Sequence, residues 1–264
     1  MGESYFVANR NKWLGTPATA YGVIPATAGL ARPISTCLSL EFVRITNRHT
    51  SAQAGGLAGL LADSVWEAGQ WVNATTTYTN DSTDAQDAGT NDFPLQTTTI
   101  ADGHLVGADL PFGVISYDVT TASVGAAQEH TYKYWNGTAW TAIAAVGMMI
   151  DGPRTAGQTW AVGEQVVAFI PPSDWAKGGS GTGVNQARYN FLVQASVAAT
   201  TAALARRLYV GMLLFGDPSL AANSGTFTVG PGQPIGIQPY AAHLQAFFPT
   251  ASEGNMLHLV WHVL

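Results

Sequence analysis

Two histidines near the C-terminal end, His258 and His262 in the stretch HLVWH, have the four-residue spacing of a metal-binding pair on a helix. Alternation places Leu257, Leu259, Trp261 and Val263 on one face of a strand and both histidines on the other. At a rise of about 3.3 Å per residue, the two histidines of a strand stand about 13 Å apart. One zinc ion cannot bridge that distance, so we expect no metal site here.

An acidic stretch, TNDSTDAQDAGTND at residues 79–92, offers oxygen ligands of the kind that Ca²⁺ prefers. Its carboxylates are those of Asp81, Asp84, Asp87 and Asp92, and Asn80 and Asn91 add amide oxygens. The spacing does not match the ligand positions of an EF-hand loop. We expect a solvated acidic loop, and calcium binding is the alternative.

A glycine-rich stretch, GGSGTG at residues 178–183, resembles a phosphate-binding loop only in composition. It lacks the Lys-Ser/Thr ending of such a loop and the spacing of a dinucleotide fingerprint or a nucleophile elbow. We expect a flexible loop tip. No Ser/His/Asp set or carboxylate pair can be assembled from the sequence, so the prediction is a protein that is not an enzyme and has no cofactor.

The stretch YKYWNGTAW, from Tyr132 to Trp140, places four large aromatic residues around Asn136-Gly137. Asn-Gly is a strong signal for a type I′ hairpin turn, which needs positive φ at both central residues. Aromatic residues that flank such a turn stabilise the hairpin by packing across it. The alternative is an exposed platform for ligand stacking, formed by Trp135, Trp140 and Trp175.

Two-residue alternation recurs along the chain and predicts many short strands. Examples are PFGVISYDVT, WAVGEQVVAFI, RYNFLVQASV, RRLYVGMLLF, HLQAFF and NMLHLVWHVL. In RYNFLVQASV the pattern indicates a half-buried strand, with Phe191 and Val193 on one face and Leu192 and Gln194 on the other. Only residues 52–69 and 197–208 are tolerably helical in pattern, and the second of these also fits a strand end, a loop and a new strand.

These elements predict an all-β fold, a β-sandwich or jelly roll with additional strands from both termini. We expect a central module at residues 66–211. The flanking segments, residues 1–65 and 212–264, are expected to pair into a second small sheet or to join the edge of the first.

Composition limits the function further. Hydrophobic residues make up 47% of the chain and charged residues only 11%, which is low for a free soluble domain and favours a surface covered by copies or partners. The net charge of −6 argues against nucleic-acid binding. Cys37 is the only cysteine, so no intrachain disulfide is predicted. The first residues lack a basic run followed by an apolar core, and no apolar run is long enough for a membrane helix, so we expect neither a signal peptide nor a membrane helix.

Positive charge is concentrated near the start of the chain, and residues 49–132 contain no Lys or Arg. The early basic residues are Arg10, Lys12, Arg32, Arg44 and Arg48. A polarised chain can use its two ends for different neighbours, and we expect these five residues to dock to an acidic partner. Solvated loop charges are the alternative.

Four stretches between about residues 102 and 197 resemble, in order, a β-sandwich module of tailed-bacteriophage virion proteins. They are LPFGVISYDVTTA, YKYWNGTAWTAI, GEQVVAFIPPSDWAKG and ARYNFLVQASV. The last stretch has Leu192 and Gln194 where such modules often have arginines, so contacts of those arginines are not carried over. The resemblance implies a structural virion component without catalytic residues, assembled as a trimer or another closed oligomer.

The most specific expectation is a capsid decoration (cement) protein. It is expected to be assembled in the host cytoplasm, to bind the major capsid protein and copies of itself on the exterior of the virion, and to contact no membrane. A tail or baseplate component is the nearest alternative. A carbohydrate-binding module for host-surface glycans is another alternative, which would use Trp135, Trp140 and Trp175.

Overall fold

The computed structural model divides the chain into two compact units, Leu61–Val210 and a flanking unit made of Met1–Leu60 with Gly211–Leu264. It describes residues 10–13, 29–30, 40–47, 53–87, 89, 92–125, 130–144, 147–151, 160–215, 227–229, 234–237, 244–248 and 257–263. The sequence-based prediction places the central module at residues 66–211. Each unit is described by itself below.

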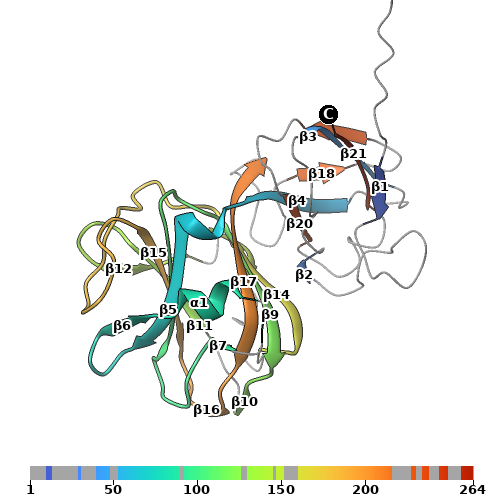
Figure 1. Cartoon of the computed structure of the whole chain (residues 1–264). Helices are drawn as coiled ribbons and strands as arrows, with labels where there is room; N and C mark the ends of the chain where they lie inside the picture. The colour runs from blue at the N-terminus through green and yellow to red at the C-terminus, as the bar shows by residue number, and fades with distance from the viewer. Residues whose placement is uncertain are drawn as a thin grey trace, which may run out of the picture. The chain divides into compact units, whose positions relative to one another are not determined.

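The central unit contains a six-stranded antiparallel sheet, with the order β12-β11-β15-β8-β5-β6 (Figure 1). The strands are β5 (Trp66–Val72), β6 (Thr77–Asn80), β8 (Gly103–Ala108), β11 (His130–Trp135), β12 (Trp140–Ala142) and β15 (Tyr189–Ala195). A short 3-10 helix, η1 (Asp63–Val65), precedes β5, and the helix α1 (Ser82–Gln86) follows β6.

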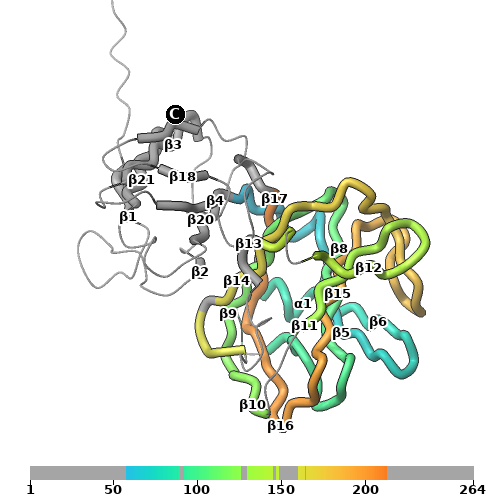
Figure 2. The backbone as a smooth tube through the Cα atoms, turned by 180° about the vertical axis from the view of Figure 1, so that it is seen from behind, coloured from blue at the N-terminus to red at the C-terminus, as the bar shows by residue number. Residues whose placement is uncertain are grey.

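A second sheet of the same unit has the order β13-β14-β9-β17. Its strands are β9 (Val114–Thr121), β13 (Met148–Asp151), β14 (Gly163–Phe169) and the first part of β17 (Leu204–Phe215), and β7 (Phe93–Pro94) pairs with β17. A further pair, β10 (Val124–Gly125) and β16 (Ala199–Thr201), lies at one end of the unit (Figure 2).

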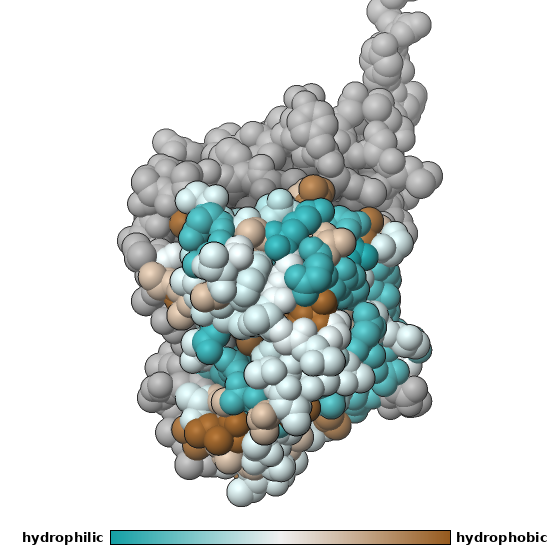
Figure 3. Space-filling view, turned by 90° about the vertical axis from the view of Figure 1, so that its left-hand side faces the viewer, coloured by the Kyte–Doolittle hydropathy of each residue, from teal (hydrophilic) through white to brown (hydrophobic). Residues whose placement is uncertain are grey.

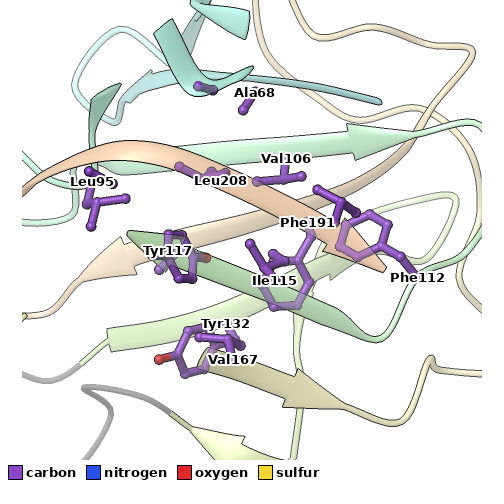
Figure 4. Packing of buried hydrophobic residues seen from close by; sticks show 14 of the residues in the cluster. Ala68, Leu95, Val106, Phe112, Ile115, Tyr117, Tyr132, Val167, Phe191 and Leu208 are labelled. Atoms are coloured by element: carbon purple, nitrogen blue, oxygen red, sulfur yellow. The ribbon is translucent and has the colours of Figure 1, made fainter. Parts of the chain in front are cut away.

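The hydrophobic core lies between these two sheets. Phe191 and Val106 come from the six-stranded sheet, and Ile115, Val167 and Leu208 come from the other sheet; all five belong to one buried cluster (Figure 4). Phe169 and Phe191 stack across this core with ring centroids 4.4 Å apart. Two sheets that share one core form a β-sandwich-like arrangement, and the prediction of an all-β fold is confirmed.

In the flanking unit, strands from the two ends of the chain pair with one another. One sheet has the order β1-β21-β3-β19. Its strands are β1 (Arg10–Trp13), β3 (Leu40–Asn47), β19 (Pro234–Ile237) and β21 (Leu257–Val263). The strand β4 (Gln53–Leu60) pairs with β18 (Phe227–Val229), β20 (Leu244–Phe248) and the end of β17, and β2 (Gly29–Leu30) pairs with β20.

The helix that the sequence pattern indicates at residues 52–69 does not form. These residues form β4, η1 and the start of β5. Gly55 and Gly56 disfavour a helix, and partners from distant parts of the chain on both sides of β4 supply its backbone hydrogen bonds. Within the described residues, no helix has the length and apolar character that crossing a membrane requires.

Candidate interaction face of the six-stranded sheet

The face of the six-stranded sheet that points away from the sandwich core carries a second, smaller apolar cluster. Its members are Trp71, Tyr78, Leu105, Val184 and Leu192, with Trp140 packed against them. Leu105 and Leu192 are cross-strand partners, and side chains alternate between faces along each strand. We call this surface, with Trp135, the tryptophan face.

Three tryptophans meet edge to face on this surface. The ring of Trp140 lies 6.0 Å from that of Trp71 and 5.6 Å from that of Trp135, measured between centroids. Trp71 and Trp140 belong to strands four places apart in the sheet, which in a flat sheet would be separated by about 19 Å. Long indole side chains and a sheet that curls toward this face therefore bring the two rings together.

The glycine-rich residues 178–183 lie across these rings. A Cβ atom on Gly179 would stand 2.8 Å from the Trp140 ring, and one on Gly181 would stand 2.8 Å from the Trp71 ring. The indole N–H of Trp140 donates a 3.0 Å hydrogen bond to the carbonyl of Ser180. The prediction of a flexible loop tip is wrong, because this loop packs against the tryptophan face and side chains there would prevent the approach.

The loop also covers an edge of the sheet. Thr182 forms a parallel bridge with Thr77 of the edge strand β6. The backbone N–H of Tyr78 donates to the carbonyl of Thr182 over 2.8 Å, and the N–H of Thr182 donates to the carbonyl of Thr76 over 2.9 Å. Edge strands present unpaired backbone groups, and here the loop satisfies them.

Polar contacts fix the far end of the loop to the sheet. The guanidinium of Arg188 forms a 2.7 Å ion pair with Asp109 and also donates to the carbonyl of Val65. The side-chain amide of Asn185 donates to Glu67 Oε2 over 3.0 Å. Since β15 is thereby covered on its outer face as well, it is buried on both faces, in contrast to the half-buried strand that the sequence predicts.

The structure separates the three tryptophans proposed as a stacking platform. Trp135 and Trp140 are half-buried and touch each other on the tryptophan face. Trp175 lies in the sandwich core, only 7% exposed, with its ring 5.0 Å from that of Phe112. Its indole N–H donates to the carbonyl of Asn190 over 3.1 Å. The three-residue platform is therefore wrong in its third member.

The hairpin between β11 and β12 differs from the predicted turn. Trp135 and Trp140 are cross-strand partners, so four residues form the loop. Gly137 has a φ of +95°, whereas Asn136 does not have positive φ, which a type I′ turn requires. The Asn136 carboxamide instead accepts hydrogen bonds from the backbone N–H groups of Thr138 and Ala139, 3.0 and 2.8 Å long. Tyr132 and Tyr134, which precede the turn, are buried in the core.

The five basic residues expected to dock to a partner all belong to the flanking unit. Arg10 and Lys12 lie on β1, opposite Trp261 and Leu259, and Arg44 lies on β3, opposite Val260. Arg32 and Arg48 lie outside the described residues.

The candidate metal ligands are spread over both units. Asp81, Asp84 and Asp87 lie at or beside α1. The pKa of Asp81 is raised, mainly by burial and next by the negative charge of the neighbouring Asp84 carboxylate. His258 and His262 lie on β21, which confirms the predicted strand. Among the residues that the structure describes, no group of three or more His, Cys, Asp or Glu side chains could hold a metal ion.

Sequence reasoning missed Trp71, Tyr78 and Glu67 as parts of this face. For Glu67 and Trp71 the signal is the alternation of Glu67, Gly69 and Trp71 along β5, where a glycine separates two side chains that share a face. No family model, curated protein or solved structure matches the chain.

Proposed function

We propose that this chain is a non-enzymatic structural protein of a bacteriophage virion, and specifically a decoration protein that binds the outer shell of the capsid. One observation carries the proposal: charge is divided between the two units. Leu61–Val210 contains thirteen Asp and Glu residues and six Lys and Arg residues, which gives a net charge of −7. The flanking unit contains four Asp and Glu residues and five Lys and Arg residues, which gives a net charge of +1.

This division gives the units different roles. The flanking unit contains Arg10, Lys12, Arg32, Arg44 and Arg48. An acidic shell would attract that unit and repel the central one, so electrostatics would orient the protein as it docks. The five basic residues are the proposed contacts with the major capsid protein.

Surface composition supports an assembled rather than a free protein. Charged residues make up 11% of the chain. On the face shown in Figure 3, residues of near-neutral hydropathy lie between groups of hydrophilic ones, and hydrophobic residues form small separate groups. Such a surface is suited to burial against neighbouring copies or a shell. Cement action would follow if contacts bridge capsomer junctions, because expansion of the shell must then break them.

Co-sedimentation with capsids that lack the protein tests the proposal. Saturable binding to heads, together with a higher temperature or force for rupture of the decorated particles, is the expected result. Heads that neither bind the protein nor gain stability would overturn the decoration role.

A tail or baseplate component is the second candidate, since the resembled module occurs on both heads and tails. Electron microscopy of virions that carry a labelled copy of the protein separates the two locations. Label confined to the tail selects this candidate and excludes the decoration role.

Glycan binding is the third candidate, and the contact between the half-buried Trp135 and Trp140 favours it. Their rings meet at 67°, so they cannot form one flat platform; a sugar would stack on one ring and contact the edge of the other. Saturable quenching of tryptophan fluorescence by soluble glycans, lost in Trp135→Ala, would support this function.

A further inference from the structure

Four buried polar atoms beneath the loop of residues 178–188 have no hydrogen-bond partner among the described residues. One is the indole nitrogen Nε1 of Trp71, and three are oxygens: Oε1 of Glu67, the hydroxyl oxygen of Tyr78 and Oδ1 of Asn190. Asn190 is completely buried and Tyr78 is 4% exposed. An unsatisfied buried polar group is costly, and native proteins usually provide it with a protein or water partner.

Glu67 and Asn190 flank Gly107 on the tryptophan face. Both are cross-strand partners of Gly107, one on each side, so their side chains share its face of the sheet. Gly107 has no side chain of its own, and Oδ1 of Asn190 lies only 2.4 Å from the place where its Cβ would be. Cβ of Arg188 lies 3.1 Å from the same place, so the side chains of Asn190 and Arg188 cover Gly107, and Glu67 lies beside them on the neighbouring strand.

Tyr78 reaches the same region from the edge strand. Its ring lies over Gly69, with Cε2 2.6 Å from the place of a Cβ there, and Gly69 is the next residue on this face after Glu67. Burial is the main cause that raises the pKa of Tyr78. The negative charge of Glu67 is the next largest cause, and the positive charge of Arg188 opposes the rise. The hydroxyl thus lies within the electrostatic reach of both side chains.

Donor and acceptor chemistry specifies what would satisfy all three oxygens. The carboxylate oxygen of Glu67 can only accept. The orientation of the Asn190 carboxamide is fixed because its NH₂ group donates to the carbonyls of Gly178 and Asn185, over 2.9 and 2.8 Å, so its Oδ1 also accepts. Two acceptors cannot bond to each other, whereas the hydroxyl of Tyr78 can donate.

The nearby cation is engaged elsewhere. The guanidinium of Arg188 forms hydrogen-bond contacts with Asp109 and Val65, and its Nε lies 3.9 Å from the other carboxylate oxygen of Glu67. A single partner for the three oxygens must therefore supply two donors and one acceptor. Water has this pattern, and buried waters typically make about three hydrogen bonds.

We propose that Glu67, Tyr78 and Asn190 form an internal water site beneath the loop of residues 178–188. The bound water donates to Glu67 Oε1 and Asn190 Oδ1 and accepts from the hydroxyl of Tyr78. It joins β5, β6 and β15 and is an integral part of the attachment between the loop and the sheet. The site is independent of the proposed virion function.

A crystal structure of the full chain at a resolution that shows ordered solvent is the direct test. We expect one water within hydrogen-bonding distance of all three oxygens. A direct hydrogen bond between Tyr78 and Glu67, with no ordered solvent beside them, would overturn the proposal.

Unfolding of Tyr78→Phe provides a test in solution. Loss of the hydroxyl leaves the water one partner short, and we expect the unfolding equilibrium constant to rise about fivefold. Tyr209→Phe, which changes a half-buried tyrosine of β17, is the matched control and should leave the constant nearly unchanged. An unchanged or lower constant in Tyr78→Phe would mean that the hydroxyl has no partner, and would overturn the proposal.

Discussion

The hydroxyl of Tyr117 and Nε2 of His104 lie 3.1 Å apart in the interior of the sandwich and join its two sheets. Nδ1 of His104 lies 2.7 Å from the carbonyl of Leu95, which can only accept, so Nδ1 carries the proton. Nε2 is then unprotonated and accepts from Tyr117. The structure therefore holds His104 as a neutral imidazole, which makes folding sensitive to pH.

Acidification should destabilise the central unit through His104. Complete burial is the main cause that lowers the pKa of His104 from 6.5 to about 4. Between these values the unfolded chain binds a proton that the folded chain excludes, so stability is full above pH 6.5 and falls toward pH 4. This difference in pKa between the folded and unfolded states predicts that the free energy of unfolding is about 2 kcal/mol lower at pH 5 than at pH 7.

Urea unfolding at a series of pH values measures this loss. His104→Gln removes the titrating group, so the variant should lose stability less steeply between pH 7 and pH 5 than the unmodified protein. Equal slopes for the two proteins would show that His104 does not cause the dependence.

A side chain at Gly183 should destabilise the loop over the tryptophan face. Gly183 has a φ of +85°, and a Cβ there would stand 2.3 Å from the backbone oxygen of Tyr78, which cannot move away easily. Gly163 also has positive φ, +109°, but nothing lies within 4 Å of its Cβ position. We expect Gly163→Ala to cost about 1–2 kcal/mol. Gly183→Ala should cost at least about 1 kcal/mol more, because overlap adds to the backbone strain.

Denaturant unfolding of both alanine variants checks the difference. The reverse order, with Gly163→Ala more destabilised, would contradict the close approach of Gly183 to β6. Proteolysis within residues 178–188 should also be faster in Gly183→Ala than in Gly163→Ala.

Trp175 and Trp135 should respond differently to the same substitution. Trp175→Phe leaves a void in the sandwich core and removes the hydrogen bond to Asn190, so we expect a loss of about 2–3 kcal/mol. Trp135 is half-buried, and Trp135→Phe should cost under about 1 kcal/mol. Thermal or urea unfolding of the two variants tests this order, and similar losses would argue against the core position of Trp175.

Docking through the flanking unit predicts charge-dependent binding to the shell. Arg10→Gln with Lys12→Gln should weaken capsid binding about two- to tenfold in low salt, and less in high salt because ions screen the attraction. Lys177→Gln with Arg206→Gln removes the same charge from the exposed surface of the central unit and should have little effect. Co-sedimentation at two salt concentrations measures both pairs, and equal effects would rule out selective docking.

The sequence alone determined the class of fold and many of its strands. Alternating side chains placed β9, β14, β15 and β21 correctly, because the two-residue period of a strand is a local property of the chain. The aromatic residues around Asn136 correctly predicted a hairpin, and the interior positions of Tyr132 and Tyr134 follow from the same period. Local pattern did not identify the turn type, because Asn136 uses its carboxamide to cap the turn.

Tertiary structure alone decided which aromatic residues are available and what the glycine-rich loop does. Local sequence does not tell which of Trp140 and Trp175 is buried, yet only Trp175 enters the core between the sheets. Residues 178–183 have no side chains that signal packing, and the tertiary structure places them against Trp71 and Trp140, whose rings lie 6.0 Å apart. Such contacts join residues about 40 to 110 positions apart, and pairing over that separation is set by topology rather than by local preference.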